Sequence, residues 1–259
     1  MAPDTQGVLV AITGVIAIRL VVSDTFLAYV KPGMRIPLLI AGIIMTVLGA
    51  VTAFKAMRAG RTTEPPVDVA GGAADAHEVH DDGPGPSHSH GAPPVAWLLL
   101  LPLLAVLLVA PAPLGSYAAA RSDPREVVIR TEPASSYPPL AAPREGAVDL
   151  TIGEFLERVY YDDSGSLEGT PVRLTGFVVK IPERPDAYFL TRFVISCCAA
   201  DAFAMQAIVA TDDIPANDTW LEVVGTWDPD DEGLEQAGRT ATLQPTAVRP
   251  VEPPANPYE

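Results

Sequence analysis

The sequence PVRLTGFVVK at residues 171–180 decides the fold of the second half of the chain. Its residues from Val172 to Val178 alternate between two faces, with the period of a half-buried β-strand. Four further segments have the β-branched and aromatic composition of strands, namely residues 187–196, 205–211, 220–227 and 240–248. Pro245 indicates that the last of them is an edge strand, because proline cannot donate a ladder hydrogen bond.

A short helix is predicted immediately before these strands. Thr151 and Glu154 have the spacing of a capping box, and Leu150 and Phe155 occupy the positions of a hydrophobic staple. We expect this helix to end near Tyr160. One N-terminal helix and five short strands predict a mainly-β domain at residues 149–249, an OB-like five-stranded barrel, with a β-sandwich as the alternative.

The charge and the apolar residues of this chain lie in different halves. The 259 residues carry a net charge of −15 and a mean hydropathy of +0.23. Residues 121–259 hold 24 of the 32 acidic residues and have a net charge of −13, whereas residues 1–120 have a net charge of −2. This distribution excludes one uniform soluble domain, and the lack of a basic face predicts no nucleic-acid partner.

Three apolar runs supply most of the hydrophobicity, at residues 7–30, 34–54 and 95–114. A helix crosses a bilayer core of roughly 30 Å with about 20 apolar residues, so we expect three transmembrane helices and a multi-pass membrane protein. The N-terminus lacks the basic residues of a signal peptide, which favours a retained first helix. Lys55, Arg58 and Arg61 follow the second run and orient the 55–94 loop to the cytoplasm, with residues 121–259 outside the cell.

Arg19 and Asp24 interrupt the first apolar run. They are five residues apart and would not face each other on a helix. One interpretation is that both contact polar groups of another membrane subunit, since an isolated charge in a membrane is costly. The alternative is that the span ends near Val22 and Arg19 extends to the headgroups.

The segments that flank the third run are predicted to be unfolded. Residues 61–94 form a His/Asp-rich loop, residues 121–148 a Pro-rich stalk, and residues 250–259 a tail. The loop holds every histidine of the protein: His77, His80, His88 and His90. Imidazole and carboxylate groups suit zinc, nickel or copper, so this loop is either a weak metal site without defined geometry or a solvated linker.

The sequence RFVISCCAADA at residues 192–202 contains both cysteines of the chain. Cys197, Cys198 and Asp201 offer two sulfurs and one carboxylate, a set that suits zinc or another thiophilic divalent ion with one ligand still to be supplied. A vicinal disulfide with redox chemistry is the second interpretation. The third is a pair of buried structural thiols, with Asp201 capping a short helix and Arg192 pairing with it.

The same stretch resembles a characteristic part of the YcgQ-like family of bacterial permease subunits. That family has a double-cysteine segment followed by a segment similar to Trp220-Leu221-Glu222-Val223-Val224-Gly225-Thr226-Trp227. The order of apolar runs and polar loop is also similar. The resemblance implies a plasma-membrane protein that acts beside a multi-spanning permease subunit, with Arg192, Trp220 and Trp227 as structural residues near the cysteine site.

No enzyme is expected. The soluble half has no histidine, so it cannot form a Ser-His-Asp or Cys-His pair. The sequence therefore predicts an accessory subunit of a membrane transport system, with an external domain that meets the substrate or the permease. The alternative is a membrane-anchored metal-binding or thiol-redox sensor that works alone.

Overall fold

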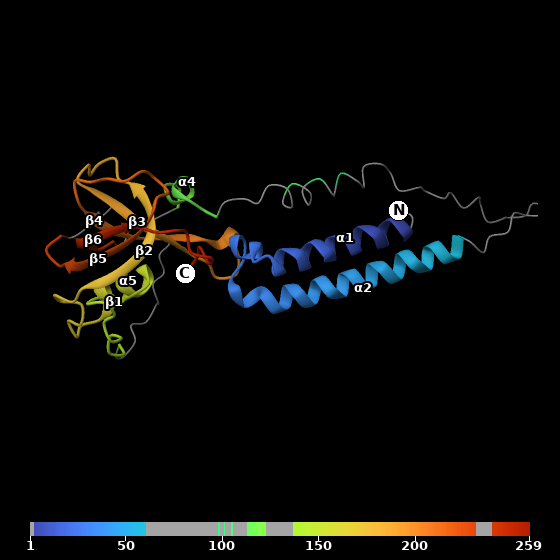
Figure 1. Ribbon diagram of the computed structural model, residues 1–259, viewed down its shortest axis with the longest axis horizontal. Helices are drawn as coiled ribbons and strands as arrows, with labels where there is room; N and C mark the ends of the chain where they lie inside the picture. Colours follow the sequence, from blue (N-terminus) through green and yellow to red (C-terminus); the bar gives the residue numbers. More distant parts are fainter. Residues whose placement is uncertain are drawn as a thin grey trace, which may run out of the picture. The chain divides into compact units, whose positions relative to one another are not determined.

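The computed structural model describes residues 3–60, 113–122, 137–231 and 240–259, together with the single positions 98, 101 and 105. The chain divides into two compact units (Figure 1). The first contains the helices α1 (Pro3–Val22) and α2 (Arg35–Gly60). The second contains residues 24–34 and the C-terminal part of the chain from Pro111.

Helices α1 and α2 pack against each other as an antiparallel pair, which brings their backbones unusually close. A Cβ added to Gly14 would lie 2.6 Å from the carbonyl oxygen of Gly42, so the packing requires glycine there. Small residues of this kind let two apolar helices approach closely. The outward faces stay apolar, with Ile36, Ile40, Ile43, Val47, Leu48 and Phe54 all exposed.

The prediction of three transmembrane helices is met only in part. Within the residues that the structure describes, one helix, Pro32–Arg58, is long and apolar enough to be a candidate span. The apolar helix Gln6–Val22 is shorter, because the chain leaves the helix after Val22. The predicted third span, residues 95–114, lies largely outside the described residues.

A mixed six-stranded sheet forms the centre of the C-terminal domain. Its strands are β1 (Val148–Asp149), β2 (Val172–Lys180), β3 (Ala187–Val194), β4 (Phe203–Ala210), β5 (Trp220–Asp228) and β6 (Thr242–Pro250). The strand order is β1-β2-β3-β4-β6-β5, and β2 also pairs with β5. The pairs β1–β2 and β4–β6 are parallel and the others antiparallel. The mainly-β prediction is therefore confirmed, but the sheet has six strands rather than five.

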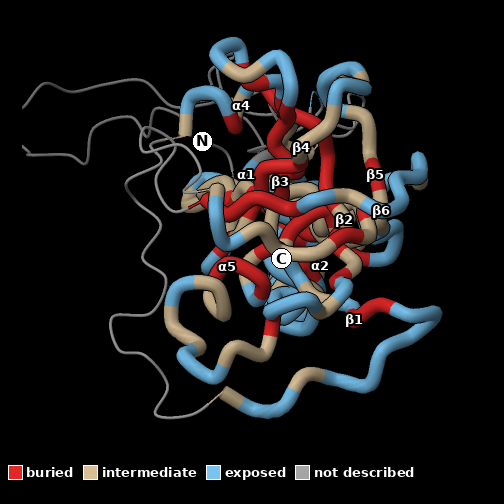
Figure 2. Tube along the Cα trace, turned by 90° about the vertical axis from the view of Figure 1, so that its left-hand side faces the viewer, coloured by how far each residue is buried: buried red, intermediate tan, exposed pale blue. Residues whose placement is uncertain are grey.

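Helix α5 (Ile152–Tyr161) covers one face of the sheet. Its predicted capping box is confirmed: the Thr151 hydroxyl accepts from the Glu154 amide at 3.0 Å, and the Glu154 carboxylate accepts from the Thr151 amide at 2.9 Å. Ile152, Phe155 and Leu156 are fully buried against the strands. Figure 2 shows the buried residues running along the central strands and α5.

The opposite face of the sheet carries a second apolar cluster. Strict alternation along β2 ends at Gly176, because Phe177 and Val179 on the other face are also buried. The chain end provides the cover: Tyr258 is 2% exposed and the Glu259 amide donates to the Phe193 carbonyl at 2.9 Å. The prediction of an unfolded tail at residues 250–259 was thus wrong. The stalk is also shorter than predicted, since Leu140 already packs on the core.

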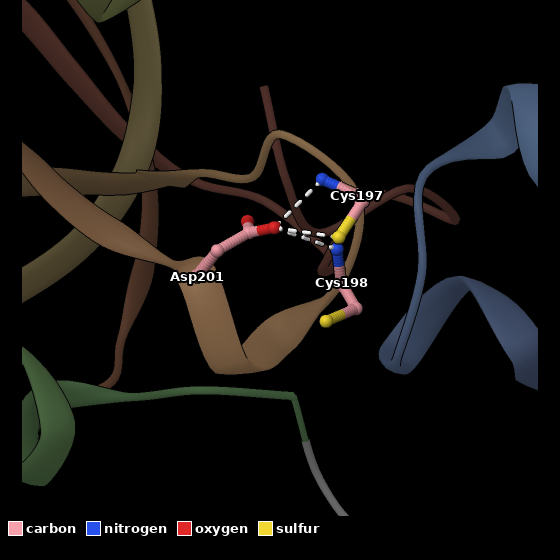
Figure 3. A group of neighbouring side chains, drawn as sticks. All are labelled: Cys197, Cys198 and Asp201. Atoms are coloured by element: carbon pink, nitrogen blue, oxygen red, sulfur yellow. Dashed lines mark hydrogen bonds between the residues drawn. The ribbon is translucent and has the colours of Figure 1, made fainter.

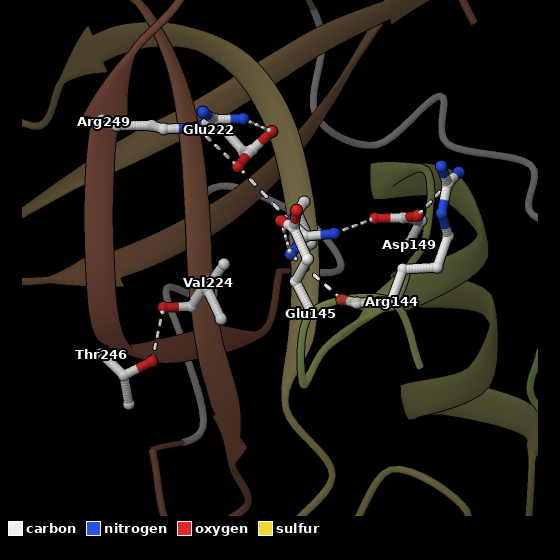
Figure 4. A network of polar contacts seen from close by, with 8 residues as sticks. Arg144, Glu145, Asp149, Glu222, Val224, Thr246 and Arg249 are labelled. Atoms are coloured by element: carbon white, nitrogen blue, oxygen red, sulfur yellow. Dashed lines mark hydrogen bonds and ion pairs between the residues drawn. The ribbon is translucent and has the colours of Figure 1, made fainter. Parts of the chain in front are cut away.

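A network of ion pairs fixes β1, β2, β5 and β6 on the outer surface (Figure 4). Arg173 donates to Asp149 at 2.7 Å and lies 3.4 Å from Glu222. Glu222 in turn accepts two hydrogen bonds from Arg249, at 2.8 and 2.9 Å. Both arginines are therefore held by acids of the same domain.

Candidate functional site

The double-cysteine segment lies in the connection between β3 and β4. Ile195, 1% exposed, anchors its start in the second apolar cluster. The backbone then leaves the sheet and forms the short 3-10 helix η5 (Ala199–Asp201), with Cys198 in an extended conformation as its N-cap. We call residues 195–202 the cysteine loop. Cys197 is exposed and Cys198 is half-buried, so neither is a core thiol.

Asp201 organises this loop from inside (Figure 3). One carboxylate oxygen accepts from the Ser196 amide at 2.7 Å. The other accepts from the amides of Cys197 and Cys198, at 2.8 and 3.2 Å. The Cys197 thiol also donates to it, with an Sγ–Oδ2 distance of 2.8 Å. The bond from the Cys198 amide is one half of a capping box, in which Cys198 is the N-cap of η5 and Asp201 its third residue, so the predicted part of Asp201 in capping a short helix is confirmed.

The same hydrogen bonds set the protonation of the loop. The bond from the Cys197 thiol, together with the three backbone amides, lowers the pKa of Asp201 to about 2. In return, the Asp201 carboxylate raises the pKa of the Cys197 thiol to about 11, with a smaller contribution from Cys198. In the absence of metal, the loop at neutral pH holds a thiol and a carboxylate rather than a thiolate and a carboxylic acid.

The three predicted ligands come together in space. One ligand atom each from Cys197, Cys198 and Asp201 lie within 4.8 Å of one another. Two cysteine sulfurs and a carboxylate oxygen are a donor set for zinc and for softer ions, and the exposure of Cys197 leaves room for water or another ligand. A cation bound there would take the place of the proton that the Cys197 thiol shares with Asp201.

Arg192 has a role different from the predicted pairing with Asp201. It is 8% exposed, and its guanidinium donates to the carbonyls of Asn256 and Tyr258 at 3.1 and 3.2 Å. It also lies 5.1 Å from the ring centroid of Trp220. The pairing prediction was wrong because the C-terminal segment, which was expected to be unfolded, supplies the partners of Arg192.

Glu259 lies beside Arg192 and reaches the start of α5. Its carboxylate is 3.9 Å from the Arg192 guanidinium and accepts from the amides of Ile152 and Gly153, at 3.1 and 3.2 Å. Burial raises the pKa of Glu259 in spite of these bonds. Trp227, the other tryptophan predicted near the site, packs on the main core at the far end of β5. Arg192 and Trp220 therefore organise the domain rather than the cysteine loop itself.

The remaining predicted site residues are not brought to this loop. His77, His80, His88 and His90 lie outside the described residues. Arg19 is exposed in the last turn of α1, as expected if the helix ends near Val22. Asp24 stands outside the helix with a left-handed φ of 57° and precedes the 3-10 helix η1 (Thr25–Ala28).

Sequence reasoning missed one part of the site. Residues 24–34, which include η1 and the 3-10 helix η2 (Pro32–Met34), contact the backbone of the cysteine loop. These contacts use backbone amide and carbonyl groups, which every residue except proline has, so no side-chain pattern signals them. The aromatic Tyr258 in the Pro-rich tail was a weak signal that the tail packs on the domain.

Residues 147–259 match a family model described as the DUF1980 C-terminal domain. This range covers the complete sheet, α5 and the cysteine loop, and amounts to less than half of the chain. No curated protein and no solved structure matches the chain. The C-terminal domain is thus similar to a defined domain family, and its chemistry has to be argued from its own residues.

Proposed function

We propose that this protein is a membrane-attached accessory component of a transport system, and that its C-terminal domain binds a thiophilic cation at Cys197, Cys198 and Asp201. The convergence of three ligand atoms within 4.8 Å on one exposed loop is the observation that carries this proposal. Two sulfur ligands select zinc, copper(I) or cadmium over calcium and magnesium, which prefer oxygen. The domain is a binding module and not an enzyme.

The protonation of the loop favours cation binding over redox chemistry. A redox-active cysteine needs a readily formed thiolate, usually with a lowered pKa. Here the Asp201 carboxylate raises the pKa of the Cys197 thiol. A metal ion reverses this effect, because its positive charge stabilises both thiolates and the adjacent carboxylate. The same negative group that hinders oxidation therefore assists the capture of a cation.

The transport context rests on the sequence resemblance to the YcgQ-like permease subunits and on the candidate span in α2. We propose that the helices dock on a multi-spanning permease in the bacterial plasma membrane, with Arg19 and Asp24 as contacts. The domain would then present a captured ion to that permease. The strand pairings, which return from β5 to β2, support an OB-like barrel as its architecture.

Metal content of the purified full-length protein tests cation binding. To isolate the cysteine site, the four loop histidines are replaced by alanine in every sample. We expect about one equivalent of cadmium or zinc after dialysis, with a sulfur-to-cadmium charge-transfer band in the ultraviolet. Cys197→Ser/Cys198→Ser should lose both signals, and Ser196→Ala, a control beside the cysteines, should keep them. Equal and negligible metal in all samples would remove the proposal.

Co-purification tests the transport context separately. A tagged chain extracted in mild detergent should recover a multi-spanning membrane protein. Arg19→Leu should reduce this recovery if Arg19 is a contact, with exposed Arg58→Leu in α2 as the matched control. A chain that binds metal but purifies alone would favour the stand-alone sensor instead.

A further inference from the structure

Residues 24–34, which we call the inter-helix segment, form a small antiparallel bridge with the cysteine loop. Val30 pairs with Cys198. On one side of this bridge the Lys31 amide donates to the Cys197 carbonyl at 3.2 Å. On the other side the Ala199 amide donates to the Tyr29 carbonyl at 2.7 Å. The segment therefore contacts the backbone on both sides of Cys198.

A second set of contacts anchors the inter-helix segment to the same domain. The Tyr258 hydroxyl donates to the Ala28 carbonyl at 2.9 Å and accepts from the Leu114 amide at 3.4 Å. Phe26 is 3% exposed. The carbonyl of Tyr258 also accepts from Arg192. The inter-helix segment is therefore hydrogen-bonded to Tyr258 near the C-terminus as well as to the cysteine loop.

The cysteine loop is consequently held from two directions. Asp201 binds the amides of Ser196, Cys197 and Cys198 from inside. From the other side, the inter-helix segment donates a hydrogen bond to the Cys197 carbonyl and accepts one from the Ala199 amide. A change in the conformation of Cys197 or Cys198 must alter one or both of these sets of bonds, because the two sets meet at the Cys197–Cys198 peptide: its amide donates to Asp201 and its carbonyl accepts from Lys31.

We infer that cation binding at Cys197, Cys198 and Asp201 is coupled to docking of the inter-helix segment on the cysteine loop. This inference rests on the proposed cation site. Docking restricts the two cysteine residues to one backbone arrangement, so the ion binds a preformed site. By linkage, the factor by which docking strengthens ion binding is also the factor by which the ion strengthens docking.

The chain connectivity gives this coupling a functional direction. The inter-helix segment continues directly from the end of α1 at Val22 and leads into α2 at Arg35. Occupancy of the cation site thus changes the stability of the segment that joins the two apolar helices. An accessory subunit built in this way reports the presence of an ion to its membrane part through the backbone alone.

Ala199→Pro breaks the bridge with little change to the cysteine loop. Ala199 is the first residue of η5, where proline is well tolerated, and Cys198 before it is already extended with φ −153° and ψ 168°. Proline removes the amide that donates to Tyr29. Ala199→Ser keeps that amide and is the matched control. Lys31→Pro removes the other bridging amide without altering the loop sequence, and Lys31→Ala is its control.

The experiment uses the full chain in detergent with the four histidines replaced by alanine, and cadmium as the probe. We expect cadmium to bind about tenfold more weakly to Ala199→Pro and Lys31→Pro than to their controls, since each variant lacks one of the two bridging hydrogen bonds. Cadmium should also slow amide hydrogen exchange at residues 24–34 in the chain that carries only the histidine replacements and in the two controls. It should not slow this exchange in the proline variants. Unchanged exchange within β3 and β4 establishes that the variants are folded.

Two other results would overturn the coupling, and they differ in what they mean for the cation site. Equal cadmium affinity in all variants, with exchange at residues 24–34 indifferent to cadmium, overturns the coupling and leaves the cation site in place. A chain without any cysteine-dependent cadmium signal overturns the cation site, and the coupling with it. If hydrogen exchange in β3 and β4 rises in one proline variant, that variant is partly unfolded and the other proline variant is used instead. The two variants remove bridging amides from opposite sides of the bridge, Ala199 in the cysteine loop and Lys31 in the inter-helix segment.

Discussion

At the scale of single residues, the position of Asp201 explains the chemistry of the double cysteine. Its spacing from Cys197 lets one carboxylate close a turn over three successive amides and still accept the thiol proton. The sequence allowed this cluster to be predicted because its members lie within five residues. It did not allow the contact with Tyr29 to be predicted, since that contact joins backbone groups 170 residues apart.

Asp201→Asn should make Cys197 more reactive toward iodoacetamide. The Asp201 carboxylate raises the pKa of this thiol from an ordinary value of 9.0 to about 11, so neutralising it increases the thiolate fraction at pH 8. Asp201 is the largest cause of this rise, with smaller contributions from Cys198 and burial, so its loss gives at most roughly 100 times more thiolate, reduced to at most about tenfold in rate by the lower nucleophilicity of a less basic sulfur. Mass spectrometry of the Cys197 peptide in metal-free protein measures this rate.

The control for this measurement is Glu183→Gln, which removes an equal charge from an exposed turn of the same domain. In the unmodified protein the alkylation rate should still be rising with pH at pH 10, because the raised pKa keeps the thiol protonated there. A rate that levels off near pH 9, or one that Asp201→Asn leaves unchanged, would contradict the assigned hydrogen bond.

At the scale of elements, local patterns predicted α5 and the five long strands closely. The helix was expected to end near Tyr160 and ends at Tyr161, and the strand expected at residues 220–227 is β5 (Trp220–Asp228). Local patterns failed for β1 and for the packed C-terminal segment. Both are short and lie in Pro-rich sequence, so their structure depends on distant strands rather than on their own composition.

Gly225→Ala should destabilise the C-terminal domain. Gly225 lies in β5 beside a register shift opposite Pro245, and an added Cβ would lie 3.0 Å from the Leu243 Cγ and closer still to the Gln244 carbonyl oxygen. We expect a loss of about 2 kcal/mol in the free energy of unfolding, typical of overpacking against a backbone that cannot move. Denaturant unfolding of the full chain, followed by tryptophan fluorescence, measures it.

Gly153→Ala is the matched control for this loss. Gly153 lies in the first turn of α5, and a Cβ there would approach nothing closer than 3.5 Å, the Met205 Cε. Alanine in a helix is favoured over glycine, so this variant should gain about 0.5–1 kcal/mol. Equal losses in both variants would mean that the glycines of the domain matter for a reason other than the space at the β5 bulge.

At the scale of the whole molecule, the separation of charge and apolar residues matches the two compact units. The unit with α1 and α2 exposes apolar side chains, and the acidic residues belong mainly to the unit with the sheet. Arginines of the sheet surface are paired with acids. Because residues 121–259 have a net charge of −13, the electrostatic potential of this domain is negative and attracts cations. That potential would raise the local concentration of the ions that the cysteine loop is proposed to bind.

The proposed orientation, with the C-terminal domain outside the cell, can be tested by labelling. In a Cys197→Ser/Cys198→Ser background, Glu183→Cys places one thiol on an exposed turn of the domain, and Ser87→Cys places one in the His/Asp-rich loop. The basic residues after the second apolar run predict that this loop is cytoplasmic. A membrane-impermeant maleimide on intact cells should therefore label Glu183→Cys and spare Ser87→Cys, and permeabilised cells should label both. The reverse pattern would place the cysteine loop in the cytoplasm and the histidines outside the cell, so that the histidines would again lie across the membrane from the cysteine loop. Labelling of both sites in intact cells would mean an even number of spans between residues 87 and 183, and the third apolar run would then not cross the membrane.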